Sequence, residues 1–283
     1  MRLLVTGGTG DLGREVCKQA AASGYEVIAT YHAHPERLQP IPVKYAVKID
    51  LAAANEIRSL LETCNPDAII HTATTNTGPD IYGTIAAMAR NLIAFTRPGV
   101  RLINLSSDVV FDGLHAPYGD DDPPSPVLPS DYARGKAEAE RLFSQASGML
   151  TIRTSLIYAF DRSNKQIAWM AKAIEAGAKV RLYVDEFRNP IWVENLAEAV
   201  IELAATKLAG TINVAGPVTL SRFELGRGLL SAMGYDPDHF AEPVSGAGTG
   251  RAPNLALDVS KAQKLLATRL LTLEEAAARS RGS

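Results

Sequence analysis

The sequence predicts an α/β protein with a doubly wound parallel sheet and a smaller, mainly C-terminal subdomain. Three observations lead to this prediction. Short apolar, β-rich runs alternate with stretches of helical period, a glycine-rich turn follows the first run, and the alternation loosens after Ser155. Because right-handed crossovers join alternating strands and helices, the strands are expected to run parallel with helices on both faces.

The first half of the chain supplies most of the predicted sheet. Short apolar runs predict strands at residues 3–6, 26–31, 68–72, 101–106 and 149–154. Apolar residues that recur on one face predict helices at residues 13–23, 55–63, 82–96 and 132–145. Residues 113–130 are rich in proline and aspartate without helical period, so we expect a long surface loop beside the strand ends.

The second half is less regular. Helices are expected at residues 165–175, 195–206, 221–232 and 260–266, with one further strand at residues 211–215. The glycine-rich residues 246–250 are expected to form a mobile loop. The tail, residues 276–283, is expected to fray because chain ends that pack against nothing lose order.

Composition excludes several classes of protein. The chain has 283 residues, 46% of them hydrophobic, and a formal net charge of −2. Without a basic surplus, neither nucleic acid nor an anionic membrane is expected as a partner. Two cysteines give no disulfide framework and no zinc motif, so no metal is expected. No apolar run reaches the roughly 18 residues of a membrane span, and a reducing cytoplasm is the expected compartment.

The glycine turn between the first strand and the first helix predicts a dinucleotide site. Gly7, Gly10 and Gly13 follow the spacing G-x-x-G-x-x-G. Glycine allows the backbone N–H groups to approach a pyrophosphate, and the helix N-terminus attracts that anion. This strand–turn–helix context predicts a Rossmann fold. Its cofactor contacts are expected from Gly7, Thr9, Gly10, Asp11 and Leu12. The alternative is a tight turn that binds no ligand.

The end of the second strand favours NADP(H) over NAD(H). Proteins that bind NAD usually place an acid there for the ribose 2′-hydroxyl, whereas this chain has His32 and then Arg37. An arginine can pair with a 2′-phosphate, although Arg37 could equally be a solvated loop charge. Asp50, next to Leu51, could accept a bond from the adenine amino group or cap the following helix.

The small residues Thr72, Ala73 and Thr74 end the next strand, where they would let the cofactor pass. His71, which precedes them, is more in keeping with a packed strand histidine than with a catalyst.

Tyr132 and Lys136 lie four residues apart on a predicted helix, so their side chains share a face. An ammonium beside the phenol, helped by the charge of an oxidised nicotinamide, is expected to lower the pKa of Tyr132. Ser107 ends a predicted parallel strand, where ligands bind, and it could hydrogen-bond a carbonyl oxygen while Tyr132 supplies a proton. The alternative is an exposed Tyr and Lys on a helix surface.

These motifs resemble an extended short-chain dehydrogenase/reductase, in particular the dTDP-4-dehydrorhamnose reductase and sugar-nucleotide-binding family. The run from Ser106 to Gly113, S-S-D-V-V-F-D-G, is the most specific match. The resemblance also covers the glycine turn, the Tyr132–Lys136 pair and stretches beginning at Arg153, Arg188 and Arg251.

The resemblance implies NAD(P)H-dependent reduction of a keto group, in the family that of a nucleotide-linked 4-keto sugar. Ser107, Tyr132 and Lys136 would form the catalytic triad, with Tyr132 as proton donor and with Tyr132 and Lys136 also contacting the cofactor. Residues 1–157 and 189–216 would form the dinucleotide-binding domain. Residues 158–188 and 217–283 would form the substrate-binding subdomain, and a homodimer is one candidate assembly. Substrate contacts are expected from Asp108, Val109, Asn189 and Arg251.

Departures from the family pattern leave other functions open. Val109 and Leu156 stand where the family has aromatic residues of the sugar pocket, and Ile85 replaces an asparagine. A dehydratase would carry Glu after Asp108, so the valine argues against elimination. A nucleotide-sugar epimerase with a tightly held cofactor stays open. A non-catalytic NADP-binding subunit, like the regulatory subunit of methionine adenosyltransferase, also stays open.

Overall fold

The computed structural model describes residues 1–126, 130–161 and 164–282 and confirms the predicted fold class. A seven-stranded, fully parallel sheet forms the centre, in the order β11-β6-β5-β4-β1-β2-β3. Its strands are β1 (Arg2–Thr6), β2 (Glu26–Tyr31), β3 (Tyr45–Lys48), β4 (Ala68–His71), β5 (Arg101–Ser107), β6 (Leu150–Thr154) and β11 (Gly210–Asn213). Each strand predicted from an apolar run is present.

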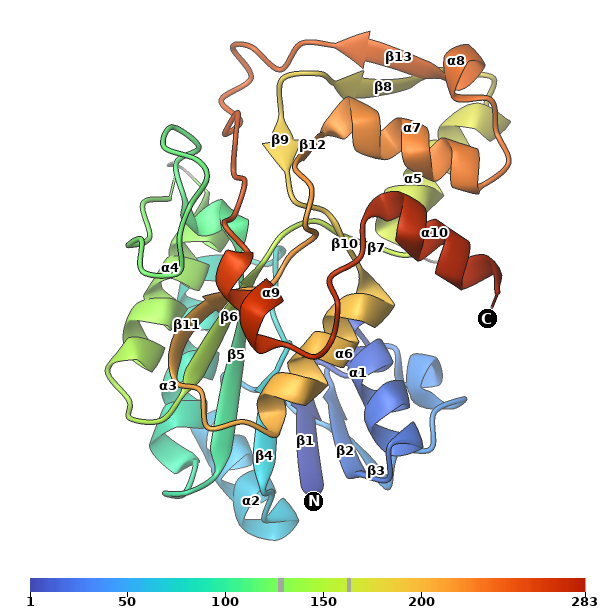
Figure 1. The fold of residues 1–283 in the computed structure, drawn as a ribbon. Coiled ribbons are helices and arrows are strands. Elements are labelled where there is room, and N and C mark those ends of the chain that lie inside the picture. Colours follow the sequence, from blue (N-terminus) through green and yellow to red (C-terminus); the bar gives the residue numbers. More distant parts are fainter. Residues whose placement is uncertain (127–129, 162–163, 283) are drawn as a thin grey trace.

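Helices cover both faces of the sheet (Figure 1). α1 (Asp11–Ala22) and α6 (Val193–Ala204) pack together on one face. α2 (Ala54–Cys64), α3 (Ile81–Phe95) and α4 (Asp131–Ser144) cover the other. The helices form where the sequence repeats apolar residues at helical spacing; in α1 this buries Leu12, Val16 and Ala20 against the sheet.

The direction in which the sheet grows reverses between the neighbouring strands β1 and β4. The strands after β1 (β2 and β3) extend the sheet on one side, and the strands after β4 (β5, β6 and β11) extend it on the other. In open parallel sheets a crevice forms at this switch point, outside the carboxyl ends of the strands. The glycine turn follows β1 and the Thr72–Thr74 segment follows β4. The topology therefore places both predicted cofactor segments at one crevice.

The second half of the chain builds a subdomain above the carboxyl ends of the strands (Figure 1). It holds α5 (Lys165–Glu175), α7 (Arg222–Ala232), the short α8 (Pro237–Phe240) and a parallel pair formed by β8 (Val180–Tyr183) and β13 (Ala241–Val244). Two-residue strands connect it to the main sheet: β7 (Ile157–Tyr158) with β10 (Ile191–Trp192), and β9 (Phe187–Arg188) with β12 (Leu220–Ser221). The proposed boundaries between the two domains stay a prediction.

The C-terminal tail is ordered as far as Gly282, so the expectation that it frays is wrong there; Ser283 lies outside the described residues. α10 (Leu273–Arg281) begins with a capping box in which Thr272 and Glu275 bond each other's backbone N–H groups. Leu273 and Ala276 are buried. Burial of one apolar face and a capped N-terminus together hold a short helix that would be marginal alone. The preceding helix, α9 (Ser260–Leu265), lies beside β11 of the main sheet.

The long loop that begins at Gly113 is irregular, as predicted, but it is tied to the fold. Tyr118 stacks on Phe111, and its hydroxyl donates to Asp112. Asn213 of β11 bonds the carbonyl of Tyr118 and, through its N–H, the carboxylate of Asp120. Residues 127–129 of this predicted loop lie outside the described residues. Within the described chain, no helix has the length and apolar character needed to cross a membrane.

Thr272→Ala tests whether the capping box anchors α10. Losing the side-chain acceptor at an N-cap costs about 1 kcal/mol, so the free energy of unfolding in urea should fall by that amount. Ser59→Ala removes a hydroxyl from an exposed position within α2 and should cause no comparable loss. Equal stability of the two variants would contradict an anchoring cap.

Candidate active site

The glycine turn is packed so closely that side chains do not fit. Gly7 has φ +71°, and a Cβ there would lie 2.7 Å from the Ala73 Cα at the end of β4. A Cβ on Gly13 would lie 2.2 Å from the Gly7 carbonyl oxygen. Gly10 is the N-cap of α1 without a side-chain cap, so the first N–H groups of the helix are left for an anion.

Arg37 lies over this turn and is not a freely solvated charge. Its guanidinium donates to the Thr9 carbonyl oxygen at 2.6 Å and to the Asp11 carboxylate at 2.8 Å. Asp11 also accepts a bond from Asn164, the N-cap of α5. His32 is exposed. A cation thus stands beside the turn, and the chain has no acid at the end of β2.

Asp50 does not cap α2, which corrects one of the two roles weighed for it. Its carboxylate accepts from the Ala52 N–H, two residues on, and the N-cap is Ala53. Asn91 of α3 bonds the carbonyl oxygens of Leu51 and Ala52 and fixes this turn. Leu51 is buried whereas Asp50 is exposed, so the acid is accessible to a ligand.

His71 is a packed histidine at the end of β4. It is 2% exposed, and its Nδ1 lies 2.7 Å from the Thr6 Oγ1. Burial, helped by the charge of Lys136, lowers the pKa of His71 to about 3. The imidazole is therefore neutral at physiological pH. Thr72 adds a second tie, because its hydroxyl donates to the Thr6 carbonyl oxygen at 2.6 Å.

The predicted Tyr-Lys pair faces inward from α4 toward β5. Lys136 is 4% exposed, and its Nζ donates to the Leu105 carbonyl oxygen at 2.9 Å. Leu105 lies two residues before Ser107 on the same strand. The Tyr132 phenol is half-buried and hydrogen-bonds the Thr74 side chain. The alternative of a Tyr and a Lys exposed on a helix surface is wrong.

The expectation that the pKa of the Tyr132 phenol is lowered is wrong for the folded protein. Burial raises the pKa of Tyr132, the Thr74 hydrogen bond lowers it, and the negative charge of Asp108 raises it further. Burial also lowers the pKa of Lys136 to about 8, because the charged ammonium is desolvated. The sequence showed the spacing of the two residues along the helix but not their burial, and burial is the largest cause of the pKa shift of each.

Ser107 and Asp108 begin a chain of polar contacts that leads into the subdomain. The Ser107 hydroxyl donates to one Asp108 oxygen at 3.0 Å, and Ser155 donates to the other at 2.6 Å. The Arg188 Nε lies 3.6 Å from Asp108. Burial raises the pKa of Asp108, while Arg188 opposes that shift. The buried carboxyl group of Asp108 therefore orients the hydroxyl group of Ser107.

The other residues predicted to contact substrate differ in burial and in the bonds that their side chains already make. Asn189 is buried. Its side-chain amide donates to the Gly216 carbonyl oxygen and accepts from the Leu257 N–H, so both of its polar atoms have partners within the protein. Val109 is partly buried against the main core. Arg251 forms a two-bond ion pair with Glu186, at 2.7 and 3.1 Å. Contact of these three residues with substrate stays a prediction.

Sequence reasoning did not assign Ser155, Glu186 or Arg188 to the site, although all three lie in this polar chain. Ser155 and Arg188 stand in stretches that matched the family pattern, and that was the available signal. Glu186 carried none, because its role depends on burial and on an ion pair with Arg251, which is distant in sequence.

The residues at the crevice fit a nicotinamide dinucleotide. The start of α1 has no side-chain cap, so its first N–H groups can bind a pyrophosphate, and Arg37 offers a cation beside the glycine turn. In the described part of the chain, no group of three or more His, Cys, Asp or Glu could hold a metal.

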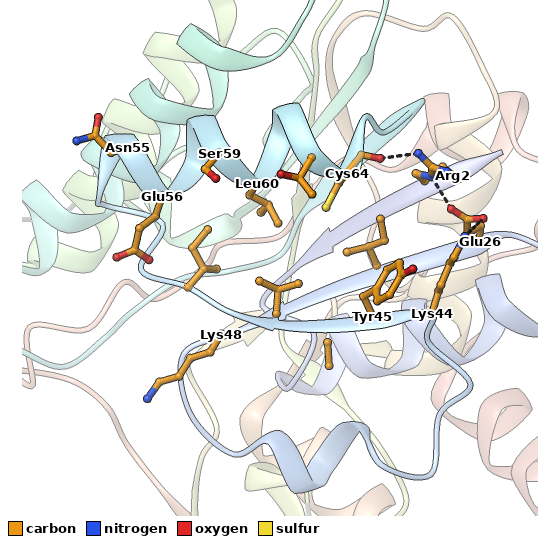
Figure 2. Close-up of a pocket in the computed structure, with 15 residues that line it drawn as sticks. Arg2, Glu26, Lys44, Tyr45, Lys48, Asn55, Glu56, Ser59, Leu60 and Cys64 are labelled. Carbon is orange, nitrogen blue, oxygen red and sulfur yellow. Dashed lines mark hydrogen bonds and ion pairs between the residues drawn. The ribbon is translucent and has the colours of Figure 1, made fainter.

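A separate cleft of about 780 Å³ lies between β3 and α2 (Figure 2). Leu60, Cys64 and Tyr45 are among its lining residues, and Arg2 bridges its end to Glu26 and the Cys64 carbonyl. None of the predicted site residues lines it. The cleft is therefore distinct from the crevice that holds the Tyr-Lys pair.

The family model described as the RmlD substrate binding domain matches residues 1–280. The chain belongs to this family. Among curated relatives, methionine adenosyltransferase 2 subunit beta of Danio rerio is 25% identical over 284 residues, covering 93% of this chain and 84% of that protein. A dTDP-4-dehydrorhamnose reductase of Mycobacterium tuberculosis is 28% identical over 263 residues, covering 87% and 80%.

Solved structures of other proteins have a fold similar to that of this chain. A Bacillus anthracis dTDP-4-dehydrorhamnose reductase in complex with NADP has a TM-score of 0.79 at 21% identity, covering 98% of this chain and 97% of that chain. The Bordetella bronchiseptica enzyme WbmH in complex with NAD⁺ has a TM-score of 0.84 at 19% identity, covering 98% and 96%. The resemblance to the RmlD family is thus confirmed, and the reductases named among the relatives support an NAD(P)H-dependent reductase.

His71→Asn tests the buried imidazole through the pH dependence of stability. The native histidine stays neutral while the unfolded one takes up a proton below its ordinary pKa of 6.5, so acid favours unfolding. From pH 7 to pH 5 the wild type should lose about 2 kcal/mol of unfolding free energy more than the variant. Urea unfolding at both pH values measures this difference.

The control for His71→Asn is His32→Asn, which changes an exposed histidine. It should lose stability on acidification as the wild type does. A His71→Asn variant that is equally acid-sensitive would mean that His71 is not a buried neutral group.

Proposed function

We propose that this protein is an NAD(P)H-dependent reductase of a keto group, with a nucleotide-linked 4-keto sugar as the substrate class. The observation that carries the proposal is the convergence of Ser107, Tyr132 and Lys136 beside the glycine turn. Lys136 bonds the strand that ends in Ser107, Tyr132 bonds Thr74, and the segment of Thr74 touches Gly7 through Ala73. The family and the named reductases among its relatives support it.

In the proposed reaction, the protein positions a carbonyl group and delivers a proton. A bound reduced nicotinamide supplies the hydride. Tyr132 Oη donates its proton to the carbonyl oxygen, and the raised pKa keeps that phenol protonated at neutral pH. Ser107 Oγ, which donates its one proton to Asp108 in the structure, would turn that proton to the same carbonyl oxygen. Lys136, which is 4% exposed, would hydrogen-bond a ribose hydroxyl of the cofactor.

We propose NADP(H) as the preferred cofactor. Arg37 stands over the glycine turn, and the chain offers no acid at the end of β2 to bind a ribose 2′-hydroxyl. Known neighbours in fold were solved with either NADP or NAD⁺. Arg37 would exchange its bond to Asp11 for the 2′-phosphate, which is a stronger anion.

The non-catalytic alternative has one specific observation in its favour, namely the likeness to the methionine adenosyltransferase beta subunit over 93% of the chain. A binding subunit would hold NADP and co-purify with another polypeptide. An epimerase would hold its cofactor tightly and show no net consumption. Net oxidation of NADPH against a panel of dTDP-, UDP- and GDP-linked keto sugars and simple ketones separates the three.

Tyr132→Phe tests the proton donor. The variant should lose at least about 100-fold in kcat, because general acid catalysis of this kind contributes that much. Affinity for the cofactor, measured by fluorescence titration, should stay near that of the wild type. Tyr45→Phe, at a 57% exposed position on β3, is the matched control and should retain full activity. Near-normal turnover by Tyr132→Phe would remove the phenol from the mechanism.

Arg37→Ala tests the preference for NADP(H). The wild type should bind NADPH more tightly than NADH, and the variant should lose roughly 10-fold or more in NADPH affinity, the size of a charge-assisted contact. NADH affinity should change much less. Arg97→Ala, on the exposed surface after α3, should alter neither. A wild type that prefers NADH would reject the assignment.

A further inference from the structure

Asp11 places an acid where the phosphate groups of a dinucleotide are expected. It is the first residue of α1 and directly follows Gly10 of the glycine turn. Its carboxylate accepts a hydrogen bond from the Arg37 Nη2 at 2.8 Å, and within the described residues no other cation pairs with it. The side chains of Asp11 and Arg37 are 27% and 30% exposed, so the pair is accessible to a ligand at the turn.

Each member of this pair has a second contact that holds it in place. The other carboxylate oxygen of Asp11 accepts from the Asn164 Nδ2 at 3.3 Å, and Asn164 is buried at the start of α5. The Arg37 Nη1 donates to the Thr9 carbonyl oxygen at 2.6 Å. The Thr9 hydroxyl donates to the Ala33 carbonyl oxygen, beyond the end of β2. Arg37 would therefore stay beside the glycine turn if the acid lost its charge.

The guanidinium of Arg37 cannot bind two anions without a loss of free energy. A phosphate monoester, such as a ribose 2′-phosphate, carries about −1.5 to −2 charges at pH 7. On binding Arg37 it must displace the Asp11 carboxylate or lie beside it, and both cost binding free energy because like charges repel. A ribose 2′-hydroxyl is uncharged and leaves the ion pair intact. The cost thus falls on NADP(H) and not on NAD(H).

We propose that Asp11 determines how strongly the protein prefers NADPH over NADH, because its carboxylate competes with the 2′-phosphate for Arg37. This inference rests on the proposed function, in which Arg37 binds that phosphate. The pyrophosphate expected at the start of α1 is repelled by the same acid. Both cofactors carry the pyrophosphate, so its repulsion cancels in the ratio of their affinities. The ratio therefore reports on the 2′-phosphate alone.

Asparagine is the informative replacement, because it keeps the shape of the side chain and removes the charge. Its amide oxygen can still accept from Asn164, and its NH₂ group offers no acceptor to Arg37. The guanidinium is then free for the phosphate, while the Thr9 bond keeps it at the turn. Glutamate retains the charge, so Asp11→Glu should stay close to the wild-type preference.

The test is isothermal titration calorimetry of NADPH and NADH on the full-length protein. Asp11→Asn should raise the ratio of NADPH affinity to NADH affinity by roughly 3- to 10-fold, the size of one partly exposed charge-assisted contact. Asp238→Asn is the matched control. Asp238 also lies in the first turn of a helix and pairs with an arginine, Arg227, at 2.7 Å, but it belongs to the subdomain, so the ratio should not change.

Combining Asp11→Asn with Arg37→Ala separates competition from direct repulsion. Without Arg37 the two anions have no shared cation, so in that background Asp11→Asn should change the ratio by less than about twofold. The full effect of Asp11→Asn in the absence of Arg37 would overturn the inference, because the acid would then act on the phosphate directly.

The other outcomes keep this inference apart from the proposed function. An unchanged or lowered ratio in Asp11→Asn overturns the inference, and a rise of equal size in Asp11→Glu overturns it as well. If Arg37→Ala leaves NADPH affinity unchanged, the assignment of Arg37 to the cofactor fails and this inference fails with it. Every readout is a binding constant, so a raised ratio in Asp11→Asn would sustain the inference even if no keto substrate were reduced.

Discussion

The contact between the glycine turn and the end of β4 is the constraint on which the site depends. Gly7 meets the backbone of Ala73 so closely that a methyl group would not fit, and Thr72 donates to Thr6 across the same junction. This contact fixes where β1 and β4 separate, and so fixes the crevice. The phenol of Tyr132 reaches it through Thr74, and Lys136 reaches it through the strand that carries Ser107.

Burial, more than local charge pairing, sets the electrostatics of this region. His71, Lys136 and Asp108 are each less than 5% exposed, and in each case desolvation is the largest cause of the pKa shift. All three shifts favour the neutral form. At neutral pH His71 is therefore uncharged, whereas Lys136, with a pKa of about 8, still carries its charge.

The sequence was sufficient for six of the seven strands of the central sheet and missed only the edge strand β3, whose residues are mostly exposed. Apolar periodicity located the helices, and the glycine spacing located the turn, because both depend on local patterns. The β8–β13 pair was missed because Val180–Tyr183 and Ala241–Val244 are short and pair across a long stretch of chain. α10 was missed even though Thr272 and Glu275 form a capping box that the sequence displays. The raised pKa of Tyr132 was out of reach, since burial is a property of the folded chain.

The protonated phenol of Tyr132 also affects how the proposed chemistry depends on pH. A tyrosine whose pKa is raised holds its proton through the neutral range and can hand it over, but it is a poor acceptor there. Alcohol oxidation would need the phenolate, which becomes abundant only in alkaline solution. The rate of alcohol oxidation should therefore rise with pH as the phenolate becomes populated, while the equilibrium between ketone and alcohol stays fixed by pH and by the ratio of the two cofactor forms.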